Sequence, residues 1–204
     1  MNKPLSRKEY EEIYAKMGDV SPIDGDCGKL CAASCCSLDG NYPEGIKNED
    51  YVMDDAEDEA DGELGIYLLP GEDALHDKGD SWLKWSEEDA LEAGFPESWT
   101  GKVQFVKCHG AENCRRDLRP IQCRTFPVAP YLTHDGKLKL ILYTDTLPYK
   151  CPLAYGAYHL NDDFLKATFS AWSRLNQDQR IFDLVMDDSR FRDECESPLE
   201  FVYE

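Results

Sequence analysis

Basic residues are scarce in this chain. Its 204 residues include 22 Lys and Arg against 41 Asp and Glu, which gives a formal net charge of -19. A surface of that sign repels phosphate backbones, so the composition argues against a nucleic-acid-binding protein. Charge complementarity would instead favour a basic protein as a partner.

Long apolar runs are also missing. No stretch approaches the roughly 18 consecutive apolar residues of a membrane span, and residues 1–18 contain no apolar run of signal-peptide length. We therefore expect a soluble cytoplasmic protein that has no membrane partner. Hydrophobic residues still make up 42% of the chain, which is enough for one domain with a core of its own.

Cysteine, in contrast, is abundant, with nine residues. In a reducing cytosol a dense cysteine pattern more often means metal or redox chemistry than disulfide bonds. An odd count would in any case leave one thiol unpaired.

The N-terminal residues predict an amphipathic helix. Ser6 and Glu9 form a capping-box pattern, and Gly18 ends the run. The apolar side chains between them recur at helical spacing and are expected to face the core: Tyr10, Ile13, Tyr14 and Met17.

An acidic run covers residues 49–63, with nine acids and no base. We interpret it as a solvated loop. An EF-hand register could be started at Glu57, but its twelfth position would be Leu68, where a bidentate glutamate is required. The sequence therefore does not favour a calcium site.

The β signals are a strand at residues 103–106 and a hairpin within residues 128–145, where apolar stretches flank Asp135-Gly136. Between the acidic run and that strand, short helices are expected from Glu72 to Leu75 and, capped by Ser86 with Asp89, up to Gly94.

The sequence pattern of the C-terminal part predicts helices. A helix capped by Asn161 carries Phe164, Leu165, Phe169 and Trp172 on one face, and a second runs from about Asp178 to Met186. The whole pattern predicts an α+β fold in a single domain, residues 1–204. It would combine a small irregular metal-clustered core, a β-hairpin, an N-terminal helix, an acidic insert at about 44–100 and a helical tail at about 160–190.

The first cysteine cluster contains Cys27, Cys31, Cys35 and Cys36. In a continuous helix Cys27 and Cys35 would lie about 12 Å apart along the axis. Thiolates on one tetrahedral zinc lie within about 4 Å of each other. Either the segment loops around the metal, as Gly28 would allow, or its cysteines serve two centres or recruit ligands from elsewhere.

The second cluster supplies further thiols, Cys108, Cys114 and Cys123, and Cys151 follows later. It also contains the one concentration of basic residues in the chain: Arg115, Arg116, Arg119 and Arg124. Guanidinium groups would stabilise thiolates that carry net negative charge around a metal. The alternative interpretation, which is compatible with the first, is that these arginines pair with the acidic surface.

Together the two clusters resemble the YkgJ-like cysteine-cluster family, which is described as zinc- or iron-chelating domains. The likeness spans residues 27–152. It rests on the tight first group and on Cys108, Cys114, Arg119-Pro120, Cys123-Arg124, Phe126-Pro127 and Cys151-Pro152. In this chain each gap in the first group is one residue longer than the family's usual spacing, so the spacing alone does not say which cysteines share a metal.

The resemblance implies that all eight of these cysteines are candidate metal ligands, with Arg119 and Arg124 supporting the cofactor. A more distant likeness to flagellin lysine methylases rests on two of the motifs alone, and no Gly-rich nucleotide loop follows a strand. Cys195 lies outside the resemblance and is interpreted as a bystander. His109 could complete a Cys3His site, although a ligand's neighbour usually points elsewhere.

These residues predict a cysteine-thiolate protein that binds zinc or iron, with the metal in a structural or sequestering role. The alternatives are an iron–sulfur redox protein, a metal-dependent enzyme of unidentified substrate, or a metal carrier that docks a basic partner. An all-sulfur ligand set suits zinc and iron–sulfur centres about equally.

Overall fold

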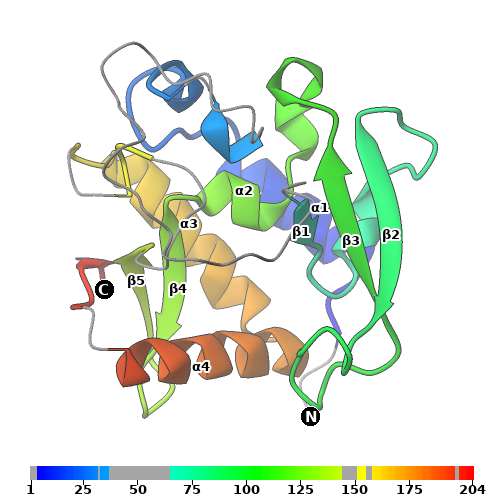
Figure 1. Cartoon of the computed structure of the whole chain (residues 1–204). Helices are drawn as coiled ribbons and strands as arrows, with labels where there is room; N and C mark the ends of the chain where they lie inside the picture. The colour runs from blue at the N-terminus through cyan, green and yellow to red at the C-terminus, as the bar shows by residue number, and fades with distance from the viewer. Residues whose placement is uncertain (1–3, 32, 37–64, 144–150, 155–157, 196–197) are drawn as a thin grey trace, which may run out of the picture.

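The computed structural model describes residues 4–31, 33–36, 65–143, 151–154, 158–195 and 198–204. The fold is α+β, as expected, with helices and two small antiparallel sheets (Figure 1). The helices are α1 (Arg7–Met17), α2 (Ile121–Thr125), α3 (Asp162–Leu175) and α4 (Gln179–Glu194). The strands are β1 (Gly65–Tyr67), β2 (Leu83–Asp89), β3 (Lys102–Cys108), β4 (Val128–Leu132), β5 (Leu138–Leu142) and β6 (Phe201–Tyr203).

The two sheets have three strands each. The first has the order β1-β3-β2 and the second the order β4-β5-β6, all pairs antiparallel. The expected hairpin is confirmed as β4 and β5, with Gly136 at a positive φ of 76° in the turn. The expected strand at 103–106 is confirmed as β3, the central strand of the first sheet.

One local prediction was wrong. The segment around Ser86 and Asp89 is not a capped helix but strand β2, followed by turns up to Gly94. The strand pairs with β3 along its whole length, from Leu83 opposite Cys108 to Asp89 opposite Lys102. Pairing with a neighbouring strand has overridden the local capping pattern. The short helix predicted at Glu72–Leu75 is present as a 3-10 turn.

The terminal helices match their predictions. The capping box of α1 is formed, with both Ser6 and Glu9 bonding the other's backbone N–H. Helix α3 begins after Asn161, and α4 extends the predicted second helix to Glu194.

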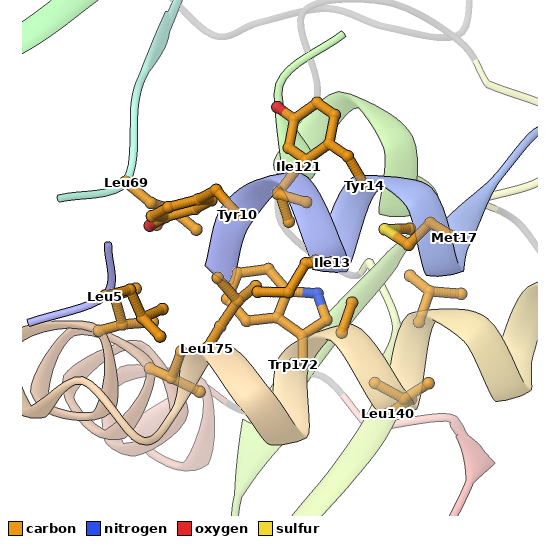
Figure 2. Packing of buried hydrophobic residues seen from close by; sticks show 14 of the residues in the cluster. Leu5, Tyr10, Ile13, Tyr14, Met17, Leu69, Ile121, Leu140, Trp172 and Leu175 are labelled. Atoms are coloured by element: carbon orange, nitrogen blue, oxygen red, sulfur yellow. The ribbon is translucent and has the colours of Figure 1, made fainter. Parts of the chain in front are cut away.

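The main hydrophobic core lies where α1, α3 and the β4–β5 hairpin meet (Figure 2). Fully buried side chains from each element pack there: Tyr10, Phe164, Leu140 and Leu175 are each 0% exposed. Residues 65–100, expected within the acidic insert, contribute Leu69, Ala90 and Trp99 to the same core. Val103 of β3 belongs to this core as well, so the first sheet packs against it.

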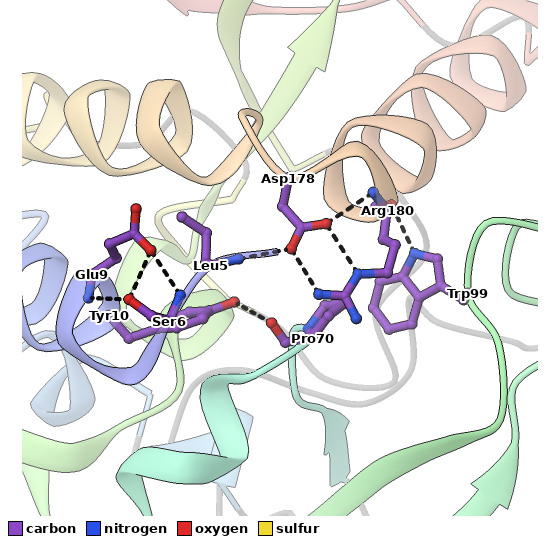
Figure 3. Close-up of polar contacts among 8 residues, drawn as sticks. All are labelled: Leu5, Ser6, Glu9, Tyr10, Pro70, Trp99, Asp178 and Arg180. Carbon is purple, nitrogen blue, oxygen red and sulfur yellow. Dashed lines mark hydrogen bonds and ion pairs between the residues drawn. The ribbon is translucent and has the colours of Figure 1, made fainter. Parts of the chain in front are cut away.

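Polar contacts join α1, α4 and the loop at Pro70 (Figure 3). The buried carboxylate of Asp178 caps α4 and accepts a hydrogen bond from the backbone N–H of Leu5 at 3.1 Å. Arg180 pairs with Asp178 at 2.7 Å, and Trp99 donates to the carbonyl of Arg180. These bonds hold the helix ends together at the rim of the core.

The acidic run at 49–63 and the calcium register considered there lie outside the described residues. In the part of the chain that the structure does describe, no helix has both the length and the apolar character needed to cross a membrane.

Candidate metal centre

Five cysteine thiols line one cavity of about 170 Å³. They come from three separate segments, and Arg119 lines the cavity with them: Cys35, Cys36, Cys108, Cys114 and Cys123. The opposite wall is apolar and includes Ile66, Val106 and Phe126. We call this the larger cavity. The fold thus brings the two cysteine clusters of the sequence together.

The backbone elements explain how these thiols meet. Cys108 is the last residue of β3, and Cys114 follows a 3-10 turn at Ala111–Asn113. Cys123 lies in the middle of α2, the short helix that leads into β4. In Figure 1 the turns of the first cluster lie beside α2. Cys108, Cys114 and Cys123 are therefore placed by three different local structures, while Cys35 and Cys36 share one 3-10 turn.

A buried carboxylate holds α2 in position. Glu72 is 0% exposed, and its Oε1 accepts hydrogen bonds from the backbone N–H of Ile121 at 2.7 Å and the hydroxyl of Tyr14 at 2.6 Å. Its Oε2 accepts from the backbone N–H of Leu69. Burial raises the pKa of Glu72. In an acidic chain, nothing in the local sequence sets this one carboxyl apart, so sequence reasoning missed it.

The first cluster loops rather than forming a continuous helix. It contains two 3-10 turns, Cys27–Lys29 and Ser34–Cys36, and Ala33 between them has a positive φ of 54°. The backbone N–H of Ala33 donates a hydrogen bond to the carbonyl of Gly28 at 2.8 Å. Because the chain reverses here, the separation of about 12 Å that a continuous helix would impose on Cys27 and Cys35 does not apply.

Three of the predicted ligands lie apart from the larger cavity. Cys27, Cys31 and Cys151 line a second, smaller cavity of about 30 Å³, together with Cys35, which borders both. The eight predicted cysteines therefore divide between two neighbouring cavities.

Burial keeps most of the thiols of the larger cavity protonated. It raises the pKa of Cys108 to about 11 and also raises the pKa of Cys114 and Cys123. Cys36 differs, because its hydrogen bond with Cys35 and the nearby guanidinium groups lower its pKa to about 7. The two sulfurs of this adjacent pair are 3.9 Å apart.

The four arginines of the second cluster have different surroundings. Arg116 pairs with Asp26 at 2.6 Å, which ties the second cluster to the first, and Arg115 pairs with Asp80 and Asp117. These two arginines therefore engage acidic side chains, which agrees with the alternative interpretation of their charge.

Arg124, predicted as a cofactor residue, directs its guanidinium group to backbone carbonyls. It donates to the carbonyls of Gly18, Arg116, Asp117 and Arg119. It also stacks over the ring of Tyr14, 4.4 Å from the centroid. Its main task is to hold the loop before α2, although its charge also lowers the pKa of Cys114.

Arg119 is the arginine that faces the thiols. It lines the larger cavity, and its buried Nε has no hydrogen-bond partner among the residues that the structure describes. Its charge acts to lower the pKa of Cys36, Cys114 and Cys123. An unpartnered buried donor beside several thiols suits an anionic thiolate centre.

The residues of the larger cavity fit a thiolate-bound metal by their chemistry. They offer soft sulfur donors, one facing cation and an apolar wall. No three His, Cys, Asp or Glu side chains within the described ranges stand in an arrangement that would hold an ion as they are. Binding would therefore draw the thiols together from their present positions.

All nine cysteines fall within the described part of the chain, and none of them forms a disulfide there. Cys195 is exposed at the end of α4, and His109 is exposed next to Cys108. Neither residue lines either cavity.

Comparisons with known proteins identify no relative of this chain. No family model, curated protein or solved structure matches this chain. The resemblance to the YkgJ-like family stays a prediction that rests on the motifs themselves.

Proposed function

We propose that this chain is a cysteine-thiolate metal-binding protein, which holds zinc or iron in its larger cavity through Cys36, Cys108, Cys114 and Cys123. The observation that carries the proposal is the convergence of thiols from three separate segments on one cavity that Arg119 also lines. The metal has a structural or sequestering role, because it joins segments that are far apart in the sequence.

The charge of the site supports this assignment. Burial disfavours free thiolates at Cys108, Cys114 and Cys123, so bringing them together as anions requires a compensating positive charge. A divalent metal supplies that charge directly, and coordination deprotonates a thiol. Arg119 then offsets part of the negative charge that four thiolates leave on the complex.

An iron–sulfur cluster is the second candidate, and the size of the cavity favours it. A single zinc ion holds its thiolates within about 4 Å of one another. A cavity of about 170 Å³ has room for roughly ten water molecules, and a cluster places several iron and sulfide ions between its cysteines. A redox protein or a metal-dependent enzyme would be the corresponding function.

Either kind of centre is consistent with a protein of the reducing cytoplasm. Among the described residues no cysteine forms a disulfide, and thiolate ligands stay available only where disulfides do not form.

The test is metal analysis of chain purified without oxygen, together with its absorbance spectrum. We expect at least about one equivalent of metal per chain. A colourless zinc protein supports the first candidate, and a brown protein bleached by dithionite supports the second. Metal below about half an equivalent, with the thiols intact or oxidised to disulfides, would contradict both.

Two cysteine variants locate the centre. Cys123→Ser should lose the metal of the larger cavity, because Cys123 lies in α2 at its wall. Cys195→Ser is the matched control, since its thiol is exposed and borders neither cavity. Equal metal content in the two variants would place the site elsewhere.

A further inference from the structure

The smaller cavity has the features of a separate metal site. Four thiols line it, those of Cys27, Cys31, Cys35 and Cys151. Cys31 and Cys151 are each only 6% exposed. At about 30 Å³ it has room for roughly two water molecules, against roughly ten in the larger cavity. A space of this size suits one ion rather than a cluster.

The walls of the smaller cavity are apolar. Leu30, Leu153 and Phe126 line it, and they belong to a small hydrophobic cluster with Cys151. Zinc sites that serve structure are closed and four-coordinate, with no position left for substrate. An apolar surround with four thiols offers the ligand set of that class.

The chain path gathers these thiols from two directions. Asp26 caps the turn that starts at Cys27, through a hydrogen bond from the backbone N–H of Gly28 at 3.0 Å. The left-handed Ala33 then turns the chain back, so Cys35 faces the same cavity as Cys27 and Cys31. Cys151 enters from a segment far along the sequence.

Cys35 lines both cavities, and its sulfur lies 3.9 Å from that of Cys36. The larger cavity already has four thiols without it, and the smaller has three. Because a closed zinc site takes four ligands, Cys35 completes the smaller set.

We propose that Cys27, Cys31, Cys35 and Cys151 form a second metal centre, a tetrahedral four-thiolate site for one zinc ion, distinct from the centre in the larger cavity. The inference rests on the proposed function, thiolate metal binding, and adds a second site with its own ligand set. This ion ties the first cysteine cluster to the segment at Cys151, while the larger cavity remains the place for the other metal.

Metal counting in matched variants tests the division. The protein is loaded with zinc alone, and parallel samples with cobalt(II), whose absorbance reports tetrahedral thiolate coordination. Wild type should bind about two equivalents. Cys151→Ser should lose about one equivalent and keep the other, and Cys123→Ser should lose the other one, with Cys195→Ser unchanged.

Three results separate the failures. If wild type binds no metal, the proposed function itself fails. If Cys151→Ser binds as much metal as wild type, the second centre is overturned and the larger one stands. If Cys151→Ser and Cys123→Ser each lose all metal, the eight thiols serve one shared centre and the division is wrong.

A measurement on the wild-type chain covers the case in which a variant fails to fold. Iodoacetamide labelling under graded chelation, read by mass spectrometry, reports which thiols are released together. We expect two steps, one that labels Cys27, Cys31, Cys35 and Cys151, and another that labels Cys36, Cys108, Cys114 and Cys123. Labelling of all eight in a single step would overturn the proposal.

Discussion

The main core and the thiol region differ in what holds them together. We define the thiol region as the turns Cys27–Lys29 and Ser34–Cys36 with residues 108–126 and 151–154. In the core, long helices and a hairpin bury whole side chains such as Phe164 and Leu140. In the thiol region the elements are 3-10 turns and the short helix α2. Ile121 of α2 belongs to the main core, and the region's own cluster of buried apolar residues is small: Cys151, Leu153 and Ala154.

Two kinds of stabilisation therefore operate in different parts of this fold. Burial of apolar area stabilises the core without any ligand. Short 3-10 turns gain little from their own hydrogen bonds, so the thiol region depends on polar anchors and, in our proposal, on metal. Glu72 and Arg124 are the anchors, and both contact Tyr14 of α1.

The largest effect should come from opening the core. Phe164→Ala removes a ring that is 0% exposed, and we expect it to lower the free energy of unfolding by about 3–5 kcal/mol. Chemical denaturation would measure the loss. Phe191→Ala is the matched control, because Phe191 is 64% exposed and should cost less than about 0.5 kcal/mol. Equal losses in the two variants would mean that the core is misplaced.

Removing the Glu72 carboxylate, which links the two regions, should lower the free energy of unfolding by less. Glu72→Ala leaves the buried donors of Tyr14, Ile121 and Leu69 unpaired, so we expect a loss of about 2–3 kcal/mol in the free energy of unfolding. Weaker metal retention should accompany it, because α2 carries Cys123. Glu97→Ala, at an exposed position, should change neither quantity. Unaltered metal retention in Glu72→Ala would remove Glu72 from the support of the site.

The smallest effect is a change of the free energy of unfolding with pH. It comes from a residue outside both regions, His76. His76 is buried beside Trp82 and Trp85, and within the described part of the chain neither of its ring nitrogens has a hydrogen-bond partner. Burial lowers its pKa below the ordinary 6.5, against the opposing charges of Asp73 and Asp80. As pH falls through 6.5 the unfolded chain binds a proton that folded His76 resists, so the free energy of unfolding declines until the lowered pKa is reached.

The measurement compares wild type with His76→Phe at pH 8 and pH 5.5. We expect wild type to lose more stability than the variant over that interval. A parallel decline in both proteins would show that His76 does not titrate in this way.

The sequence predicted elements whose signals are local. The capping box with a helical stripe gave α1, and Asp135-Gly136 between apolar stretches gave the β4–β5 hairpin. Strand β2 was missed because its residues, Leu83–Asp89, are mostly polar and its strand character comes from pairing with β3. Such pairing depends on a partner distant in the chain, which a local pattern does not report.

For the candidate site, the sequence predicted which cysteines take part, but it did not predict which of them lie together. The cysteine motifs named eight thiols, and the structure places all eight at two cavities. Their division depends on the left-handed turn at Ala33, a residue type that gives no sequence signal for that conformation. Likewise, nothing in the spacing of the arginines distinguishes Arg119, which faces the thiols, from Arg124, which binds carbonyls.

Hydrogen exchange read by mass spectrometry, before and after chelation of metal-loaded protein, tests most directly whether the two regions are held by different means. The account predicts that chelation increases amide exchange in the thiol region and leaves α1, α3 and the β4–β5 hairpin protected. Unchanged exchange in the thiol region after complete removal of metal would contradict it.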